Sequence, residues 1–331
     1  MDCGLEEFSK FLLDNGIKIL AVATVEEAVK LRGINKDIEI LDMSSTAIKE
    51  EIQILIDNNI TITIGSQKTA ELANNIAKEG KKIKAHLKID TGFGRYGFIY
   101  KDKETIINTI KNLDKNIELK GIFTHFSLAY YKNSKSTIMQ YKAFEDILNA
   151  LENEKINIEL KHVCNSPAFF NFPEMRLNCA RIGSAFLGRV DIRGTSVGLK
   201  KIGVLKSKVS EIKIVPKDFN IGYLDTYKTK RETKIAIIPL GYKDGYNMGT
   251  KEDMFRIVDK LRNLKHGIHN LFAKQNLKVW INNRYYNVIG KIGMYHIVVD
   301  ITGENIINIG DIVEVNINPV FIDGSIRREY K

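Results

Sequence analysis

Seven short apolar runs, most of them separated by helical stretches, constrain the fold of this chain more than any other feature. They lie at residues 19–23, 38–41, 60–64, 83–89, 119–126, 158–164 and 177–182. Short apolar runs bounded by turn residues predict strands, and strands that alternate with helices predict a parallel α/β sheet. We therefore expect the first part of the chain to have an α/β fold.

The chain enters this pattern through a helix rather than through a strand. Five apolar residues recur at helical spacing ahead of a stop at Asn15-Gly16, namely Leu5, Phe8, Phe11, Leu12 and Leu13. A closed α/β barrel has eight parallel strands, each followed by a helix. Seven strands entered through a helix therefore predict a (β/α)₈ TIM-type barrel that lacks its first strand.

The pattern changes after a short polar stretch that ends near residue 198. Strand-like runs then dominate, at residues 208–215, 233–239, 277–281, 285–289, 296–301 and 311–315. Asn282-Asn283 is typical of a hairpin turn. We therefore expect a barrel domain over residues 1–198 and a mostly β domain over residues 199–331.

A helical insert near residues 251–272 interrupts the expected β domain. Its apolar residues recur at helical spacing and comprise Met254, Phe255, Ile257, Val258, Leu261, Leu264 and Ile268. Such a stripe packs into a core or a subunit contact more often than it forms a ligand site. We expect one of those two roles.

Composition excludes several classes of protein. No apolar run approaches the length of a membrane span, and the N-terminal residues do not form a signal peptide. The net charge is +10, but the lysines are scattered, so we expect neither nucleic acid nor a membrane among the partners. Cys3, Cys164 and Cys179 have no metal-ligand spacing and cannot form an even disulfide set. We expect a cytoplasmic protein without a bound metal.

Polar clusters follow several of the predicted barrel strands. The run at 83–89 leads into a glycine-rich turn that presents Arg95, and the next two runs end near His125 and near Ser166. Catalytic residues of such barrels lie at the carboxyl ends of the strands. Ser166, Ser184 and the backbone near Gly183 form a candidate anion cradle, since phosphate sites are common after the last strands.

Seven motifs resemble the alanine racemase family, in order and approximate spacing over essentially the whole chain. They are HLKIDTGFGR at 86–95, THF at 124–126, HVCNS at 162–166, RIG at 181–183, GY at 222–223, GYKDGY at 241–246 and GKIGM at 290–294. This resemblance implies a barrel with a C-terminal β domain and the cofactor pyridoxal 5′-phosphate (PLP). It also implies a homodimer with shared active sites, which converts L-alanine to D-alanine for peptidoglycan.

The resemblance also implies roles for individual residues. Arg181 would face the pyridine nitrogen and, as a group that keeps its proton, would leave that nitrogen unprotonated. Tyr223 would be a catalytic base, and His125 would tune it. The remaining implied residues are Ser166, Gly183 and Ser184 at the phosphate, Arg95 and Met294 at the substrate, and Lys88, Asn165 and Tyr242 as accessory residues. Lys88 would orient Arg95, in some relatives as a carbamate.

The family's other base is a lysine that also bonds the cofactor, and no residue of the sequence matches it. Gly4 matches the last glycine of that lysine's motif, so the lysine is expected ahead of Met1. Two further departures border the site: Ile326 stands where the family has a tyrosine, and Tyr295 where it has an aspartate. Four alternatives stay open: an alanine racemase, a racemase of serine or another amino acid, an inactive PLP-binding remnant or truncated product, and a protein in which Lys88 replaces the lysine.

Overall fold

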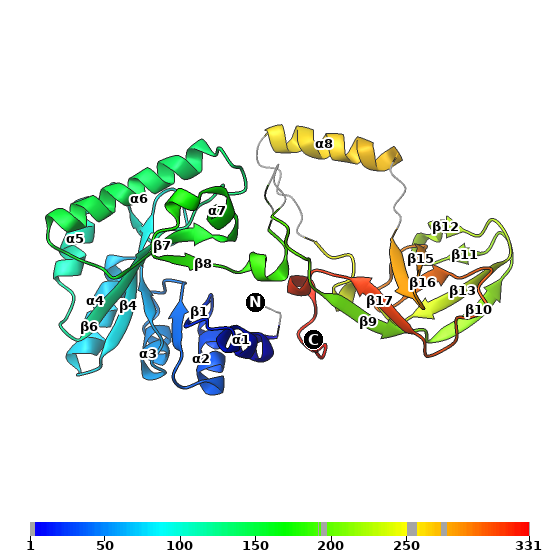
Figure 1. The fold of residues 1–331 in the computed structure, drawn as a ribbon, viewed down its shortest axis with the longest axis horizontal. Coiled ribbons are helices and arrows are strands. Elements are labelled where there is room, and N and C mark those ends of the chain that lie inside the picture. The colour runs from blue at the N-terminus through cyan, green and yellow to red at the C-terminus, as the bar shows by residue number, and fades with distance from the viewer. Residues whose placement is uncertain (1–3, 191, 193–196, 250–256, 273–276, 331) are drawn as a thin grey trace. The chain divides into compact units, whose positions relative to one another are not determined.

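The computed structural model describes residues 4–190, 192, 197–249, 257–272 and 277–330, apart from several side chains of the helix at 257–272. The chain divides into two compact units, one that ends at Lys201 and one that begins at Ile202 (Figure 1). No helix in these ranges is long and apolar enough to cross a membrane. Each unit is considered by itself.

Seven parallel strands follow one another in chain order in the first unit. They are β1 (Ile19–Val22), β2 (Glu39–Asp42), β3 (Ile62–Ile64), β4 (Ile83–Asp90), β6 (Ile117–Phe123), β7 (Leu160–Asn165) and β8 (Cys179–Arg181). β1 pairs with β2, a bridge between Leu41 and Thr61 connects β2 to the start of β3, and the order then runs β3-β4-β6-β7-β8. All seven predicted strands are confirmed. Within the described residues, β1 pairs only with β2 and β8 only with β7.

Helices follow most of these strands. They are α1 (Leu5–Asp14), α2 (Val25–Ile34), α3 (Lys49–Asp57), α4 (Gln67–Lys78), α5 (Lys103–Lys111), α6 (Lys135–Asn153) and α7 (Ser166–Asn171). Their starts are set by side chains that accept a backbone N–H of the first turn, as Thr24, Ser66, Asp102 and Ser134 do. The short strand β5 (Phe98–Ile99), which pairs alongside β4, was not predicted.

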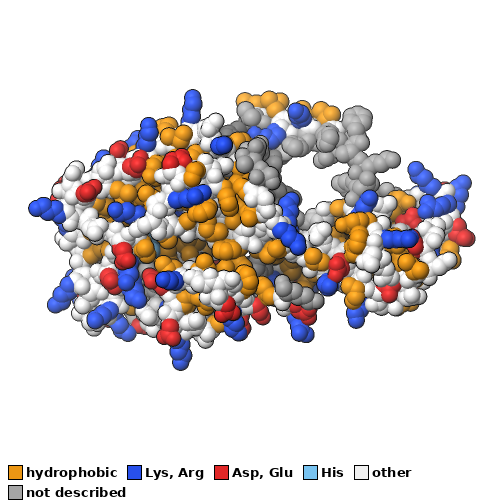
Figure 2. Space-filling view, in the orientation of Figure 1, with side chains coloured by type: hydrophobic (Ala, Val, Ile, Leu, Met, Phe, Trp, Pro, Cys, Tyr) orange, Lys and Arg blue, Asp and Glu red, His pale blue; other side chains and the backbone are white. Residues whose placement is uncertain are grey.

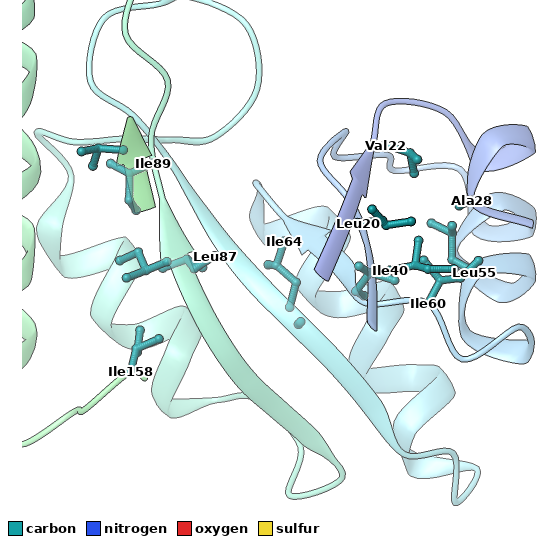
Figure 3. Packing of buried hydrophobic residues seen from close by; sticks show 14 of the residues in the cluster. Leu20, Val22, Ala28, Ile40, Leu55, Ile60, Ile64, Leu87, Ile89 and Ile158 are labelled. Carbon is teal, nitrogen blue, oxygen red and sulfur yellow. The ribbon is translucent and has the colours of Figure 1, made fainter. Parts of the chain in front are cut away.

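The core of the first unit lies between the strands and these helices. Figure 3 shows Leu20, Ile40, Leu55 and Ile60 packed together, with Ile64 beside them toward β4. Helix α1, predicted from its apolar spacing, is present and ends at Asp14; Gly16, two residues later, has a φ of 83° in the left-handed region. Its Phe8 is buried, and the Phe8 ring meets the edge of the Phe186 ring, which follows β8, at 6.1 Å.

The second unit is built around a seven-stranded antiparallel sheet in the order β10-β13-β16-β15-β14-β17-β9. The strands are β9 (Val204–Lys208), β10 (Glu211–Val215), β13 (Thr233–Ile238), β14 (Lys278–Ile281), β15 (Arg284–Ile289), β16 (Ile297–Asp300) and β17 (Ile312–Asn316). The short pair β11 (Asn220–Ile221) and β12 (Tyr227–Lys228) was not predicted. The predicted hairpin turn is confirmed, because Asn282 and Asn283 both have positive φ, at 45° and 64°.

The prediction of one strand over residues 208–215 is wrong. The backbone N–H of Val209 donates to Asp311, whereas that of Ser210 donates to Ile237. The chain therefore changes partner between these two residues, from β17 to β13. Val209 and Ile212 pack on one hydrophobic cluster, whereas Val215 belongs to a separate small cluster.

Helix α8 (Ile257–Phe272) confirms the predicted helical insert over the residues that are described. Of the two roles expected for its apolar stripe, packing into a core is not seen for Ile257, Leu261, Leu264 and Ile268, and a subunit contact stays a prediction. These side chains are 75%, 60%, 61% and 51% exposed. Met254, Phe255 and the Val258 side chain lie outside what the structure describes.

Candidate active site

Polar side chains gather at the carboxyl ends of four neighbouring strands in the first unit. β4 ends at Asp90, β6 is followed by Thr124 and His125, β7 ends at Asn165, and β8 ends at Arg181. Neighbouring parallel strands end at one edge of a sheet, so these side chains share one end of the barrel-like unit. The sequence analysis predicted a site at this end.

Arg181 holds the centre of this group with four hydrogen bonds. Its Nη1 donates to His162 Nδ1 at 2.8 Å and to the His162 carbonyl at 2.7 Å. Its Nη2 donates to the carbonyls of Thr124 at 2.7 Å and Val163 at 3.1 Å. Burial lowers the pKa of Arg181 to about 10, so the guanidinium remains charged at neutral pH. Among the described residues, only its Nε–H is left outside these bonds.

A chain of two neutral histidines continues from Arg181. A guanidinium has no acceptor, so His162 Nδ1 must accept from Arg181 and His162 Nε2 must carry the proton. That proton is donated to His86 Nδ1 at 2.9 Å, which places the remaining proton on His86 Nε2. Burial and the nearby Arg181 charge lower the pKa of His86 to about 4 and that of His162 well below its ordinary value. The resemblance gave these two histidines no role, although His86 and His162 each begin a matched motif.

His86 lies directly above Gly121, and this contact yields a prediction. A Cβ added at Gly121 would lie 2.5 Å from two atoms of the His86 ring. We expect Gly121→Ala to lower the free energy of unfolding by about 1–3 kcal/mol, because an overpacked core must shift. Urea unfolding of the wild type and the variant measures this difference.

Gly33→Ala in α2 is the matched control for that substitution. No described atom lies within 4 Å of a Cβ at Gly33. Alanine is a better helix former than glycine, so this variant should gain about 0.5–1 kcal/mol. Equal stability of the two variants would contradict the importance of the His86–Gly121 contact.

Lys88 is a buried cation on β4, with a side chain that donates to the Met43 carbonyl at 3.1 Å. Its Nζ lies 5.2 Å from the centre of the Tyr96 ring and 5.1 Å from that of Phe123. Burial and the charges of Arg95 and Arg181 lower the pKa of Lys88 to about 8. This environment disfavours the ammonium form, so Lys88 reaches its neutral form more easily than an exposed lysine does.

Asp42, at the end of β2, is a buried carboxyl that the sequence analysis missed. It is 1% exposed, and burial raises its pKa to about 6, an effect that the attraction of Lys88 opposes. Its Oδ1 accepts the backbone N–H of Ser44 at 3.1 Å. The signal that could have revealed Asp42 is its position directly after an apolar run, as for Asp90 on β4.

We expect Lys88→Met to stabilise the fold by about 1–2 kcal/mol at pH 7. A lowering of the pKa from 10.5 to about 8 corresponds to roughly 3 kcal/mol of unfavourable environment, and loss of one hydrogen bond offsets about 1 kcal/mol. Between pH 8 and pH 10 the unfolded chain holds the Lys88 proton more tightly, so wild-type stability rises and the advantage of methionine should shrink. Urea unfolding at pH 7 and at pH 10 tests this. Lys84→Met on the same strand is the control variant. A destabilised Lys88→Met at pH 7 would contradict it.

Asp90 organises the loop that carries Arg95. Its carboxylate accepts the backbone N–H groups of Gly92, Phe93, Gly94 and Arg95 at 2.8 to 3.2 Å. These hydrogen bonds hold the pKa of Asp90 below its ordinary value, although burial opposes them. The loop is therefore folded around the Asp90 side chain before any ligand arrives.

The Arg95 guanidinium lies over the Phe93 ring at 4.6 Å, and the edge of that ring meets His125 at 5.2 Å. Burial, together with the charges of Arg181, Arg95 and Lys88, lowers the pKa of His125 to about 3. His125 is therefore neutral at physiological pH. The structure thus places Arg95, His125 and Lys88 around one small pocket.

The candidate anion cradle also comes together in the structure. The Ser166 hydroxyl accepts the backbone N–H of Gly183 at 3.0 Å and that of Ala185 at 3.3 Å. Ser184 begins the 3₁₀ turn Ser184–Leu187 directly after Gly183. Asn165 accepts the Ala168 N–H at 3.0 Å and so sets the start of α7 at Ser166.

The other predicted site residues lie in the second unit, where the structure places them beside one another. The Tyr242 N–H donates to the Gly293 carbonyl, and the next residue, Lys243, donates to the Met294 carbonyl, each at 3.1 Å. A Cβ added at Gly293 would lie 3.6 Å from the Tyr223 ring. Tyr223 is 67% exposed, so its hydroxyl is accessible.

Comparison with known proteins covers both units. Residues 1–190 match the family model for the alanine racemase N-terminal domain, and residues 202–320 match that for the C-terminal domain. The alanine racemases of Methanococcus maripaludis and Clostridium perfringens are each 34% identical, over 94% and 93% of this chain and 78% and 75% of theirs. The alanine racemase structure of Clostridium difficile 630 superimposes with a TM-score of 0.79 at 32% identity, over 93% of this chain and 75% of that one. This chain belongs to the alanine racemase family of PLP-dependent isomerases.

Proposed function

We propose that this chain binds PLP at the carboxyl end of the barrel-like unit and racemises alanine there. The observation that carries the proposal is the fixed Arg181 guanidinium. Four hydrogen bonds hold it in place, and its Nε–H is directed to none of the described acceptors. A fixed, charged donor of this kind fits a neutral aromatic nitrogen.

The other residues at this end fit the remainder of the cofactor. The Ser166 hydroxyl and the backbone of Gly183 and Ser184 would hold the phosphate, and Asn165 would keep Ser166 in position. Arg181 keeps its proton and would leave the pyridine nitrogen unprotonated. PLP, when bound, withdraws electrons from the amino-acid α-carbon, and it does so less strongly when that nitrogen is unprotonated. Removal of the α-proton then depends more on well-placed bases.

Tyr223 would provide one base, and the resemblance indicates that it acts in the site of a partner subunit. His125 would accept a hydrogen bond more readily than it would carry charge, because its pKa is about 3. Arg95 would bind the substrate carboxylate, and the Met294 backbone would contact the cofactor edge. Lys88 would set the position of Arg95 through its charge. Tyr242 would support Met294 through the Gly293 carbonyl.

Cofactor binding and turnover are separate parts of this proposal, because turnover also needs the family's second base. We propose a homodimer in the cytoplasm that supplies D-alanine for the cell wall. Serine is the alternative substrate, since Tyr295 and Ile326 alter the surroundings expected of the site. A non-catalytic PLP-binding protein is the alternative activity.

A PLP titration of the chain, followed by borohydride reduction and peptide mapping, tests these possibilities together. Saturable PLP binding with conversion of L-alanine to D-alanine supports the racemase. Binding without turnover of alanine or serine supports the non-catalytic alternative. A reduced adduct on Lys88 would identify it as the lysine that bonds the cofactor. The variant Lys88→Met should then form no such adduct. Absence of PLP binding would overturn the proposed function of this chain.

A further inference from the structure

Helix α8 presents an apolar face that no described part of the second unit covers. Ile257, Leu261, Leu264 and Ile268 recur at intervals of four, three and four residues, so they lie along one side of the helix. All four are at least half exposed. Figure 2 shows hydrophobic side chains along this helix, with Lys and Arg side chains beside them. A soluble surface helix normally turns such a face toward the core.

Two exposed lysines border this face on opposite sides. Lys265 follows Leu261 by four residues, and Lys260 precedes Leu264 by four residues. Leu261 and Leu264 form the two edges of the apolar face. At 100° per residue, Lys265 lies just outside the edge formed by Leu261, and Lys260 lies just outside the edge formed by Leu264. The apolar face is therefore enclosed between two positive charges that can extend past it.

This charge arrangement disfavours pairing of α8 with a second copy of itself. The 4-3-4 spacing resembles a coiled-coil seam, in which Lys260 and Lys265 occupy the two flanking positions. Parallel helices would set Lys260 of one copy against Lys265 of the other, and antiparallel helices would pair each lysine with itself. Like charges in these positions repel.

The chemistry of the face favours a lipid surface over a protein groove. The described side chains of this face are aliphatic, namely Ile257, Leu261, Leu264 and Ile268. An apolar face bordered by lysines matches a bilayer with anionic headgroups, because aliphatic side chains enter the acyl boundary while lysines reach the phosphates. The sequence analysis expected no membrane partner, since the exposure of this face is not visible in the sequence.

We propose that α8 docks the protein on an anionic membrane surface, with its apolar face in the acyl boundary and with Lys260 and Lys265 at the headgroups. The helix has 16 residues and lies in the plane of the interface rather than across it. This inference does not depend on the proposed function, since binding is measured without PLP or substrate.

Flotation of the full chain with lipid vesicles tests the proposal. The protein should float with vesicles of phosphatidylcholine and phosphatidylglycerol, much less with phosphatidylcholine alone, and less again at high salt. Lys260→Gln with Lys265→Gln should weaken binding to the anionic vesicles by about fivefold for each charge removed. Leu264→Asp should weaken it by at least about tenfold, because a large apolar side chain is lost from the buried face.

Asn263→Asp is the matched control, because it adds the same charge as Leu264→Asp away from the apolar face. It should bind within about twofold of the wild type, since aspartate lies far from the acyl boundary. Circular dichroism of each variant establishes that the protein is folded. Equal loss of binding in both aspartate variants, or no flotation of the wild type, would overturn the proposal. A wild-type oligomer that Leu264→Asp dissolves, without vesicle binding, would instead assign the face to a second copy and would also overturn it.

Discussion

Acidification from pH 6.5 to pH 4 should lower the free energy of unfolding of the first unit by roughly 3 kcal/mol per pH unit. The cause is the group of neutral histidines around Arg181. The folded-state pKa values of His86 and His125 are about 4 and about 3, and that of His162 is also far below the ordinary value of 6.5. Each histidine must therefore remain neutral in the fold while the unfolded chain takes up a proton.

The direction follows from the protons bound by each state. Below pH 6.5 the unfolded chain binds up to three more protons on these histidines than the folded one, so stability falls with pH. Asp42 acts in the opposite direction. Its folded-state pKa of about 6 lies above the ordinary value, so on acidification the folded protein binds a proton at Asp42 before the unfolded chain does, which stabilises the fold. The net difference is about two protons, which corresponds to roughly 3 kcal/mol per pH unit.

Urea unfolding at several pH values measures this dependence, and the two units can be followed separately. Trp280, the single tryptophan, lies on β14 of the second unit, so its fluorescence reports that unit. Far-ultraviolet circular dichroism also reports the helices of the first unit. The variant His86→Met should lessen the pH slope by about one proton, or roughly 1.4 kcal/mol per pH unit.

His296→Gln is the control for this experiment, because His296 is exposed and lies in the second unit. Its pH slope should equal that of the wild type. A urea midpoint of the first unit that stays constant between pH 6.5 and pH 4.5 would show that the three histidines are already charged in the fold.

Tyr223→Phe should lower racemisation of alanine by about 10²–10⁴-fold if the protein is loaded with PLP and active, since a positioned base contributes this much. The hydroxyl alone is removed, and the ring that lies beside Gly293 is retained. PLP affinity should remain within about twofold, because no cofactor contact is assigned to Tyr223. Turnover is measured as D-alanine formed from L-alanine, and PLP binding by absorbance.

Hydrogen exchange separates a base from a merely structural tyrosine. If the protein is active, a second base must act on the opposite face, so exchange of the α-hydrogen of one alanine enantiomer with solvent deuterium should survive in Tyr223→Phe. Exchange from the other enantiomer should fall with racemisation. Tyr285→Phe on β15 is the control, since Tyr285 is similarly exposed and lies in the same unit. Unaltered turnover in Tyr223→Phe would remove it from the proposed reaction.

The strands of the first unit could be predicted because their apolar runs are buried on both sides and end in turn residues. The two-strand division at Val209 and Ser210 could not, because nothing in the apolar pattern marks where the hydrogen-bond partner changes. Hydrophobic pattern reports which side of a strand is buried. It does not report which neighbouring strand receives the backbone hydrogen bonds.

In the candidate site, too, some residues could be predicted from the sequence and others could not. Arg181, His125 and Ser166 could be found because their motifs follow predicted strands. Asp42 carries no motif; its position after an apolar run marks a strand end, but its burial near the charge of Lys88 is visible only in the structure. The exposure of α8 was equally hidden, since an amphipathic stripe has the same sequence whether a core, a copy or a membrane covers it.

The loop folded around Asp90 has a consequence for how tightly a small substrate could be held. Its backbone amides are already occupied by the protein's own carboxylate, so they offer no cradle to a substrate carboxylate. In return, binding need not order this segment, which for a disordered loop costs roughly 1–2 kcal/mol per residue. If Arg95 binds the substrate carboxylate as proposed, the entropy lost on binding should come mainly from the Arg95 side chain.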